Sequence, residues 1–553
     1  MLFLNNIIKE EDPMRKTLAM ILAIAMLLTA LVIPVASAEE IDWSTKNKIT
    51  ITWTTYFTSL PEEDSHFIKF VEDKFNVDID MLPIDDSTFN EVLNTYIMAG
   101  ETPDVIRLKD PGQFISYVDS GELGVIDMDV LRKMAPSIVT AIDEFKDGSF
   151  WDYGVVDGEQ YGIPAVAPGN IFHLPVVYNE TWLNNLGLAV PTTLDELHEV
   201  LKAFTFNDPD GNGVNDTYGL SSDGLRALFG AYGVNPGACD GRTDHSYFQL
   251  IDGKVAYAAT TEQYKEALKV ANEWYKEGII DPEFITGENT GGYWAISHSL
   301  INHRIGMTVR ANYYHWVMPG AYQLYDEEGN LVDCDAGAVA KEFLAVNPTE
   351  SVVLGQPPVG PYGSGVKSWN LLAQIYCFSK DATENAEKWE RICAIMEYMD
   401  HQYVTDKEDY VDYWTSLYGE YGKYWIWEDE DAVVARTTAK FDEDYPQAST
   451  DKWGPTQWGP TLPILQATKG NQWAQSIGYE EGGIVNLMQF SLPAVAENQN
   501  NVTHLKDTWM IDFITGAKDV DADWDAYVKE LNAAGLDKMV KEVQEWYAST
   551  QSK

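Results

Sequence analysis

Between Lys48 and Leu108 the sequence changes repeatedly between two hydrophobic periods, and this alternation constrains the fold more than any other feature. In "KITITWTTYF" apolar residues recur at every second position, as in a strand. In "EEDSHFIKFVEDKF" they recur at helical spacing. A strand "VDIDML", a helix "STFNEVLNTYIMAG" and a strand "PDVIRL" follow. Strands separated by helices predict a parallel sheet with covered faces, and therefore an α/β fold.

The same pattern predicts where a ligand binds, because ligands of parallel α/β sheets lie beyond the carboxyl ends of the strands. For the first strand this end is 54–58, and for the third it lies just past Leu108. We therefore expect Trp53 and Tyr56 at a ligand site. For Trp53 a place in the core remains the alternative, since it shares a face with the apolar residues of its strand.

The N-terminal residues carry the pattern of an export signal, expected to span residues 1–38. Arg15 and Lys16 precede a long apolar run, small residues end at Ala38, and Met14 is the more natural start. An uncleaved membrane anchor is the alternative, because the run is long enough to span a bilayer. No cysteine follows the run, so no lipidation site is expected there. We expect a protein exported to the extracellular space, the cell surface or a periplasm.

The charge balance disfavours two classes of partner. The chain has 38 Lys and Arg residues against 86 Asp and Glu residues, a formal net charge of −48. A field of this sign repels nucleic-acid phosphates and anionic lipid surfaces. We expect no nucleic-acid partner, and we interpret the acidity as a solvated surface that favours a soluble monomer.

The four cysteines are widely spaced and form no C-x-x-C pair, so neither a zinc site nor a redox motif is indicated. They are Cys239, Cys334, Cys377 and Cys393. One or two disulfides remain open. Cys393 lies on the apolar face of the predicted helix "WERICAIMEYM", which favours a buried, inert thiol.

An Asp-rich loop, "FNDPDGNGVNDTYGL", has the spacing of a calcium loop. Counted from its first aspartate, oxygen ligands recur at positions three, five and nine, and a glycine holds position six. The predicted ligands are Asp208, Asp210, Asn212, Asp216 and the carbonyl of Val214. Position twelve is Gly219 instead of a glutamate, so a further ligand must come from elsewhere. A surface turn without metal is the alternative, because Asp, Asn and Gly favour turns.

Several segments occur together in a familiar order: "DGEQYGIP", "VVYNETWLNNLGLAVPTTLDELHEVLKAF", the Asp-rich loop, "RIGMTVRANYY" and "FITGAKDVDADWDAYVKELNAAGLDKMVKEVQEWY". Over nearly all of its mature length the chain resembles the family 1 extracellular solute-binding proteins of bacterial ABC importers, close to the larger oligosaccharide and alginate binders. The resemblance implies two α/β lobes joined by three crossovers, with the ligand in the cleft between them. It also implies a cation in the Asp-rich loop, although alginate binders have an acidic residue where this chain has Thr217.

By position, the resemblance implies crossovers near Ala165–Val177, Gly306–Asn312 and Gly365–Ile375. After a linker of residues 39–47, lobe 1 is then expected to comprise 48–168 and 311–370. Lobe 2 is expected to comprise 169–310 and 371–553, including the calcium-type loop 208–219.

Eighteen tryptophans and 30 tyrosines favour sugar recognition, because an aromatic face stacks on the apolar face of a pyranose. We selected residues at predicted strand ends, crossovers or loops. In addition to Trp53 and Tyr56, the predicted ligand-binding residues are Asp85, Asp104, Arg310, Tyr313, Tyr314, Trp316, Trp369, Trp453 and Trp458. Arg310 either forks onto a uronate or pairs with a neighbouring carboxylate.

No hydrolase, nucleotide-binding or metalloprotease motif is found, and we expect no enzymatic activity. The expected function is capture of a sugar, most simply a neutral oligosaccharide given the negative field, by closure of the lobes, with delivery to an ABC permease. The alternatives are a secreted glycoside hydrolase with a carboxylate pair, a surface adhesin, and a binder of another solute such as a peptide.

Overall fold

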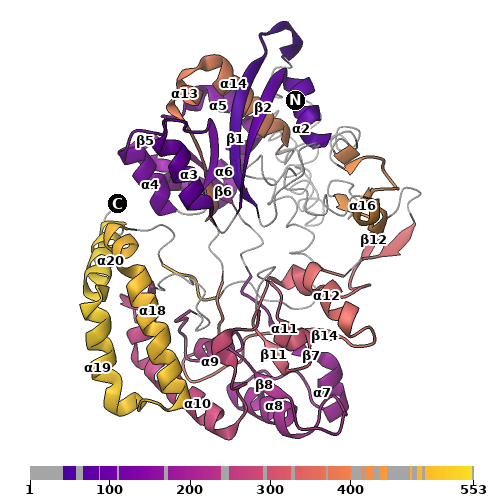
Figure 1. Ribbon diagram of the computed structural model, residues 1–553, viewed down its shortest axis with the longest axis vertical. Helices are drawn as coiled ribbons and strands as arrows, with labels where there is room; N and C mark the ends of the chain where they lie inside the picture. The colour runs from indigo at the N-terminus through magenta and orange to yellow at the C-terminus, as the bar shows by residue number, and fades with distance from the viewer. Residues whose placement is uncertain are drawn as a thin grey trace, which may run out of the picture.

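The computed structural model describes residues 41–57, 66–85, 88–108, 111–166, 172–237, 248–289, 295–325, 330–334, 336–368, 372–399, 411, 414–415, 418–427, 435–444, 474–475, 483–487 and 492–550. These residues form two lobes, one above the other in Figure 1, with connecting segments between them. The expected signal peptide, residues 1–38, lies outside the described part, in which no helix is long and apolar enough to cross a membrane.

Lobe 1 is built on a five-stranded sheet in the order β2-β1-β3-β15-β6. Its strands are β1 (Ile49–Phe57), β2 (Val77–Asp85), β3 (Val105–Leu108), β6 (Gly162–Val166) and β15 (Leu372–Phe378). β1 is parallel to β2 and β3, whereas β15 is antiparallel to β3 and β6. The predicted alternation of strands and helices is confirmed, and with it the α/β fold.

One hydrophobic core joins this sheet to its helices. The helices are α2 (His66–Phe75), α3 (Phe89–Met98), α4 (Pro111–Asp119), α5 (Met128–Met134), α6 (Pro136–Glu144), α13 (Lys380–Glu384) and α14 (Ala386–Met399). Cys377 and Cys393 lie in this core as free thiols, and burial raises the pKa of both. The predicted burial of Cys393 is therefore confirmed, whereas Cys239 lies outside the described residues.

Lobe 2 contains a four-stranded mixed sheet in the order β14-β7-β11-β8. Its strands are β7 (Val176–Asn179), β8 (Tyr218–Leu220), β11 (Ile305–Thr308) and β14 (Val352–Gly355). Its helices are α7 (Glu180–Leu186), α8 (Leu194–Phe206), α9 (Leu225–Ala231), α10 (Glu262–Glu277), α11 (His298–Ile301), α12 (Ala338–Val346), α18 (Pro493–Thr515), α19 (Val520–Ala533) and α20 (Leu536–Thr550). A hairpin of β9 (Phe248–Ile251) and β10 (Lys254–Tyr257) completes it.

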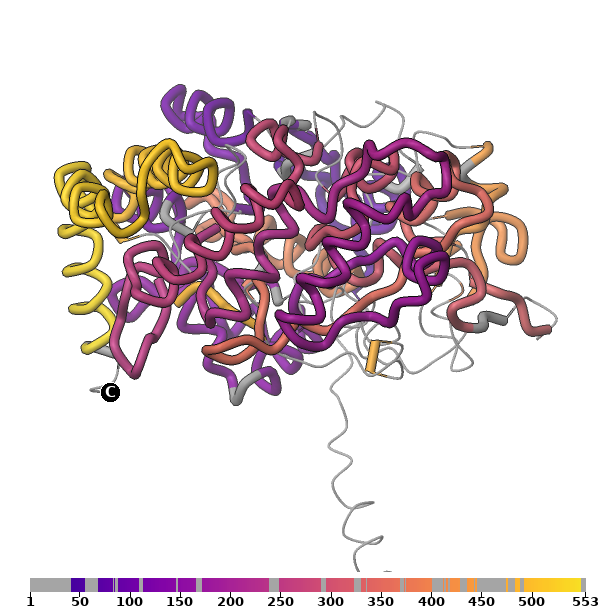
Figure 2. The backbone as a smooth tube through the Cα atoms, turned by 90° about the horizontal axis from the view of Figure 1, so that it is seen from below, coloured from indigo at the N-terminus to yellow at the C-terminus, as the bar shows by residue number. Residues whose placement is uncertain are grey.

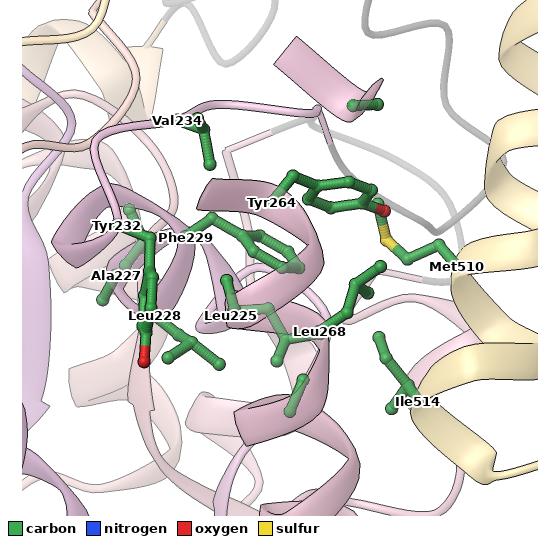
Figure 3. Packing of buried hydrophobic residues seen from close by; sticks show 14 of the residues in the cluster. Leu225, Ala227, Leu228, Phe229, Tyr232, Val234, Tyr264, Leu268, Met510 and Ile514 are labelled. Carbon is green, nitrogen blue, oxygen red and sulfur yellow. The ribbon is translucent and has the colours of Figure 1, made fainter. Parts of the chain in front are cut away.

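The C-terminal helices belong to lobe 2 because their apolar residues fill its core. Tyr264 and Leu268 lie one turn apart on α10, and Figure 3 shows Met510 and Ile514 of α18 pointing toward them. α10 begins at the N-cap Thr261, whose hydroxyl accepts from the Tyr264 amide, and ends at a left-handed glycine. Figure 2 shows α18–α20 gathered at one end of the molecule.

Three extended segments lie side by side between the lobes, and we call them the connecting segments: 172–174, 366–368 and 483–485. His173 and Ser368 form an antiparallel bridge, and Lys367 and Ile484 form a parallel one. The first segment joins β6 to β7, the second leads into β15, and the third leads toward α18. The expected crossovers near 165–177 and 365–375 thus pass between the sheets, whereas sequence reasoning missed the one at 483–487.

The expected crossover Gly306–Asn312 differs from the structure, and so do the lobe boundaries. Val309 and Ala311 are buried in the cores of lobe 2 because the chain continues directly from β11. It then enters a side sheet in the order β13-β12-β16-β17 and returns to lobe 2 with α12 and β14. Lobe 1 accordingly excludes most of 311–370 and gains β15 and α14, because their apolar residues complete its core.

The side sheet is attached to lobe 1 through β16, whose Trp425 and Trp427 lie in the lobe 1 core. Its strands are β12 (Gln323–Tyr325), β13 (Leu331–Asp333), β16 (Trp425–Trp427) and β17 (Ala435–Thr437), followed by α16 (Ala439–Asp444). Cys334, a free and buried thiol, packs beside this sheet with Val317 and Ile426.

Candidate functional site

Strand register places the carboxyl ends of the lobe 1 strands next to the connecting segments. β15 begins at Leu372, four positions beyond the end of the second segment, and pairs antiparallel with β3, so that Ile375 lies opposite Leu108. The carboxyl end of β3 therefore points toward the connecting segments, and that of the parallel β1 does so too. We call these two strand ends the crossover edge of lobe 1.

The same argument holds in lobe 2. β7 follows the first connecting segment, and Val177 at its start pairs with Thr308 at the carboxyl end of β11. β8 is parallel to β11, with Leu220 opposite Met307. The loops after β8 and β11 thus form the crossover edge of lobe 2. The strand ends of both lobes meet at the connecting segments, which is where parallel sheets bind ligands.

At the crossover edge of lobe 1, Arg107 and Gln374 form a pair that sequence reasoning missed. Arg107 Nη2 donates to Gln374 Oε1 at 3.0 Å, and the guanidinium lies 5.9 Å from the ring of Tyr376. Arg107 is buried. Only its position near the end of "PDVIRL" could have drawn attention to it in the sequence.

Two predicted ligand residues of lobe 1 have structural roles instead. Trp53 is fully buried in the core, as the alternative interpretation stated. Asp104 precedes β3, at the edge opposite the connecting segments, and its carboxylate is already engaged. It accepts from the Thr52 amide at 2.9 Å and from Lys388 Nζ at 2.7 Å. The predicted contact of Asp104 with ligand is therefore not supported, because Asp104 lies at the opposite edge of the sheet and its carboxylate is hydrogen-bonded within lobe 1.

At the crossover edge of lobe 2, Arg310 lies two positions beyond the end of β11 and turns inward. Its Nη1 lies 2.6 Å from Asp223 Oδ2, and both side chains are buried. Asp223 Oδ1 also accepts from Arg226 Nε at 3.2 Å. Of the two interpretations of Arg310, pairing with a neighbouring carboxylate is the one that the structure contains.

A second buried carboxylate, Glu288, fixes the same edge. One of its oxygens accepts from the hydroxyls of Ser297 and Thr308 at 2.6 Å each, and the other accepts from the Asp223 amide at 2.9 Å. Burial raises the pKa of Glu288 to about 7, and the nearby Asp223 charge adds to the rise. Sequence reasoning missed Glu288, since nothing distinguishes it from other acidic residues.

The predicted aromatic residues after Arg310 divide into buried and accessible ones. Tyr313 packs edge-on against Phe172 of the first connecting segment, with ring centroids 5.2 Å apart, and Trp316 donates from Nε1 to the Arg310 carbonyl at 2.7 Å. Both are buried. Tyr314 is 44% exposed, and its hydroxyl accepts from Asn312 Nδ2 at 2.9 Å. Tyr314 is thus the predicted aromatic residue that this edge presents to solvent.

The remaining predicted ligand residues lie outside the described part or have only their backbone described. The residues outside the described part are Trp369, Trp453 and Trp458. Only the backbone is described for Tyr56 and Asp85. Tyr56 and Asp85 end β1 and β2 near the crossover edge of lobe 1.

The Asp-rich loop forms a turn closed by its own side chains. Gly213 N donates to the Asp208 carboxylate, and Asn212 Nδ2 donates to Asp210 at 2.8 Å and to Asp216 at 3.3 Å. Burial raises the pKa of Asp210, and the charges of Asp208 and Asp216 contribute. Four oxygen-bearing side chains and the Val214 carbonyl suit a hard cation in chemistry. However, the described residues contain no group of three or more acidic, histidine or cysteine side chains arranged to hold a metal ion.

Residues 58–294 match the family model of the bacterial extracellular solute-binding proteins. Lipoprotein LipO of Bacillus subtilis (strain 168) is 30% identical over 47% of this chain and 51% of its own. The polygalacturonan/rhamnogalacturonan-binding protein YtcQ of the same organism is 28% identical over 43% and 46%. The fructooligosaccharide ABC transporter substrate-binding protein FusA of Streptococcus pneumoniae is 28% identical over 44% and 47%. The chain thus spans about half the length of the curated relatives it matches.

Two solved structures match over nearly the whole chain. The alginate-binding protein AlgQ2 without calcium ion has a TM-score of 0.60 at 18% identity, over 92% of this chain and 100% of its own. An EF-hand mutant of Streptococcus pneumoniae FusA with fructo-nystose has a TM-score of 0.61 at 19% identity, over 91% and 99%. These similarities establish the fold as that of two-lobed substrate-binding proteins.

Proposed function

We propose that the chain, of which residues 58–294 match the family model of the bacterial extracellular solute-binding proteins, captures an oligosaccharide between its lobes. The observation that carries the proposal is that the carboxyl ends of strands from both lobes meet at the connecting segments. Among the relatives, two are named for polysaccharide or oligosaccharide binding. The sugar is then handed to the permease of an ABC importer.

The proposed mechanism is closure of the two lobes around the sugar. The connecting segments are extended and pair through isolated bridges instead of a continuous sheet, and we propose that the bending occurs there. A ligand that touches both crossover edges binds the closed state better than the open one and shifts the population toward it. We propose that the permease recognises the closed state.

The sugar leaves the protein unchanged in this proposal. The family consists of binding proteins, and the carboxylates at the crossover edge of lobe 2 are held by other groups: Asp223 by two arginines, and Glu288 by two hydroxyls and an amide. A glycoside hydrolase needs two carboxyl groups that are free to flank the scissile bond. The chain is proposed to act outside the cytoplasm, after export by its N-terminal signal.

Calcium is proposed as a structural ion of the Asp-rich loop, held by Asp208, Asp210, Asn212, Asp216 and the Val214 carbonyl. Two structural neighbours, AlgQ2 solved without calcium ion and an EF-hand mutant of FusA, support this assignment. Bound calcium would neutralise the crowded carboxylates of the loop, whose mutual repulsion contributes to the raised pKa of Asp210. It would stabilise lobe 2 and take no part in holding the sugar.

A thermal-shift screen of the mature protein against neutral and acidic oligosaccharides tests the function. A sugar that binds the native state raises the melting temperature, and the sugar recovered afterwards should be intact. A screen in which no glycan raises the melting temperature while a peptide library does would overturn the sugar assignment. New reducing ends in the recovered sugar would make the protein a hydrolase.

A further inference from the structure

Two side chains at the crossover edge of lobe 2 differ sharply in their exposure to solvent. Arg310 is 3% exposed and bound to Asp223, whereas Tyr314, four residues on, is 44% exposed. An accessible arginine is well suited to bind a ligand carboxylate, because its planar guanidinium donates two parallel hydrogen bonds. Here Arg310 is buried, and the accessible side chain at this edge is the aromatic ring of Tyr314.

The turn that separates them is strained. Ala311, between Arg310 and Asn312, has φ +64°, a left-handed conformation that a residue with a Cβ adopts only at a cost. The turn is held by the hydrogen bond from Trp316 Nε1 to the Arg310 carbonyl and by the packing of Ala311 in the core. Arg310, before this turn, is paired with Asp223, and the stretch after it carries the exposed Tyr314.

Tyr314 is accessible to solvent and is held by its neighbours. Burial raises the pKa of its phenol, although almost half of the side chain remains accessible to solvent. Asn312 braces the hydroxyl, and the rings of Tyr313 and His315 lie 5.4 Å and 4.4 Å away. A braced, accessible aromatic ring suits stacking against the apolar face of a sugar.

Four other basic side chains near the two crossover edges, those of Arg107, Arg226, Lys367 and His315, are buried as well. Arg107 and Arg226 are each 7% exposed and bound to Gln374 and Asp223, and Lys367 of the second connecting segment is buried. Burial lowers the pKa of His315 to about 4, so that this imidazole is neutral at pH 7. The described arginines and the histidine at these edges are therefore not available to a ligand carboxylate, and the exposed Lys341, on α12 beside the Tyr313–Trp316 turn, already has an interaction partner of its own.

We propose that the lobe 2 half of the site is an uncharged aromatic platform, on which Tyr314, braced by Asn312, stacks against a sugar ring that carries no carboxylate. The inference rests on the proposed function and narrows it to neutral oligosaccharides. It separates this chain from relatives named for polygalacturonan or alginate binding. In this proposal the strained turn at Ala311 lies between the buried Arg310 and the accessible Tyr314, so that the tyrosine and not the arginine faces the ligand.

The test uses isothermal titration of the mature protein with neutral fructo-, gluco-, manno- and galacto-oligosaccharides, oligogalacturonates, oligoalginates, and the carboxyl-reduced forms of both acidic series. We expect a neutral sugar to bind, and any acidic series to bind more weakly than its carboxyl-reduced form. Tyr314→Ala should weaken binding of that sugar about tenfold, and Tyr314→Phe, which keeps the ring face, should remain within about threefold of the unsubstituted protein. Tyr362→Ala, at a tyrosine of similar exposure that packs on Tyr232, should leave affinity unchanged.

The outcomes separate this inference from the function on which it rests. Binding of acidic sugars alone, or equal affinity of the Tyr314→Ala and unsubstituted proteins for a neutral sugar, would overturn the platform while leaving sugar capture intact. If no glycan binds, both the aromatic platform and the proposed capture of a sugar are contradicted. Melting temperatures of the variants establish that each is folded before its affinity is compared.

Discussion

Arg310 Nη1 and Asp223 Oδ2 lie 2.6 Å apart, in side chains that are both buried where lobe 2 meets the connecting segments. A buried charge is tolerated only when it is paired, so this contact is expected to matter for folding. Asp223→Ala should lower the free energy of unfolding by about 3–5 kcal/mol, because it leaves buried arginine charge uncompensated. Urea denaturation measures the change.

A matched control for this pair is Lys48→Ala, which removes the ion pair of Lys48 with Asp78 in lobe 1. Both partners are about half exposed, so water and salt screen the interaction, and the urea midpoint should hardly move. Equal effects of the two substitutions would show that the Arg310–Asp223 pair is not desolvated in solution.

The pH dependence of stability should report on Glu288. Because the pKa is raised from 4.5 to about 7 in the folded state, the native protein holds the proton more tightly than the unfolded chain. The resulting stabilisation, about 1–3 kcal/mol, is fully present below pH 4.5, declines as pH rises toward 7, and is absent above it.

Glu288→Gln removes this titration while keeping the shape of the side chain. The difference in unfolding free energy between the two proteins, measured from about pH 5 to about pH 8.5, should therefore change with pH in the direction just given. A difference that stays constant across this range would mean that Glu288 titrates normally.

The packing of α9 against the segment that leads to β15 leaves no room for a side chain. A Cβ at Gly230 would lie 1.5 Å from the Gly365 carbonyl oxygen, so Gly230→Ala must move backbone. We expect a loss of about 1–3 kcal/mol or more in the free energy of unfolding.

Gly187→Ala is the comparison for this substitution, because Gly187 has φ +67° but no atom within 4 Å of the added Cβ. Only the left-handed conformation is penalised there, by about 1 kcal/mol. If Gly187→Ala cost as much as Gly230→Ala, the close approach of α9 would not be the cause.

Chelation tests the calcium assignment. EDTA should lower the melting temperature of the mature protein, and added calcium should restore it, because an ion that binds only the native state stabilises it. Asp210→Asn should abolish both responses without changing affinity for sugar. A melting temperature that is the same with EDTA and with calcium would leave the loop as a metal-free turn.

The α/β character of the chain could be predicted because it is encoded locally. The period-two and helical patterns from Lys48 to Leu108 each lie within a single element, and the structure reproduces them. The partners of a strand are a non-local choice, and here the prediction failed. β15 inserts between β3 and β6, about 200 or more residues away in sequence, which moved a lobe boundary. The connecting segment 483–485 is held by backbone hydrogen bonds of Ile484 with Val366 and Ser368, which carry no side-chain pattern.

The candidate site was predictable only in outline. The strand-end rule was applied only to lobe 1, whereas Arg310 and Tyr314 were selected because they follow the crossover that the family resemblance implied near Gly306–Asn312. Whether a residue there points inward or outward depends on the turn at Ala311, and no sequence rule gives an alanine a positive φ. Asp104 was misassigned for a related reason, since it lies at the start of β3 and not at its end. The role of Glu288 could be recognised only in the structure, where its three hydrogen-bond donors come from different parts of the sequence.

Small-angle X-ray scattering tests lobe closure most directly. The radius of gyration of the mature protein should be measured with and without a saturating amount of the tightest-binding neutral oligosaccharide, identified by titration. Closure around the sugar predicts a smaller radius of gyration in its presence. An unchanged scattering curve at full occupancy would contradict the proposal that the two crossover edges close over the ligand.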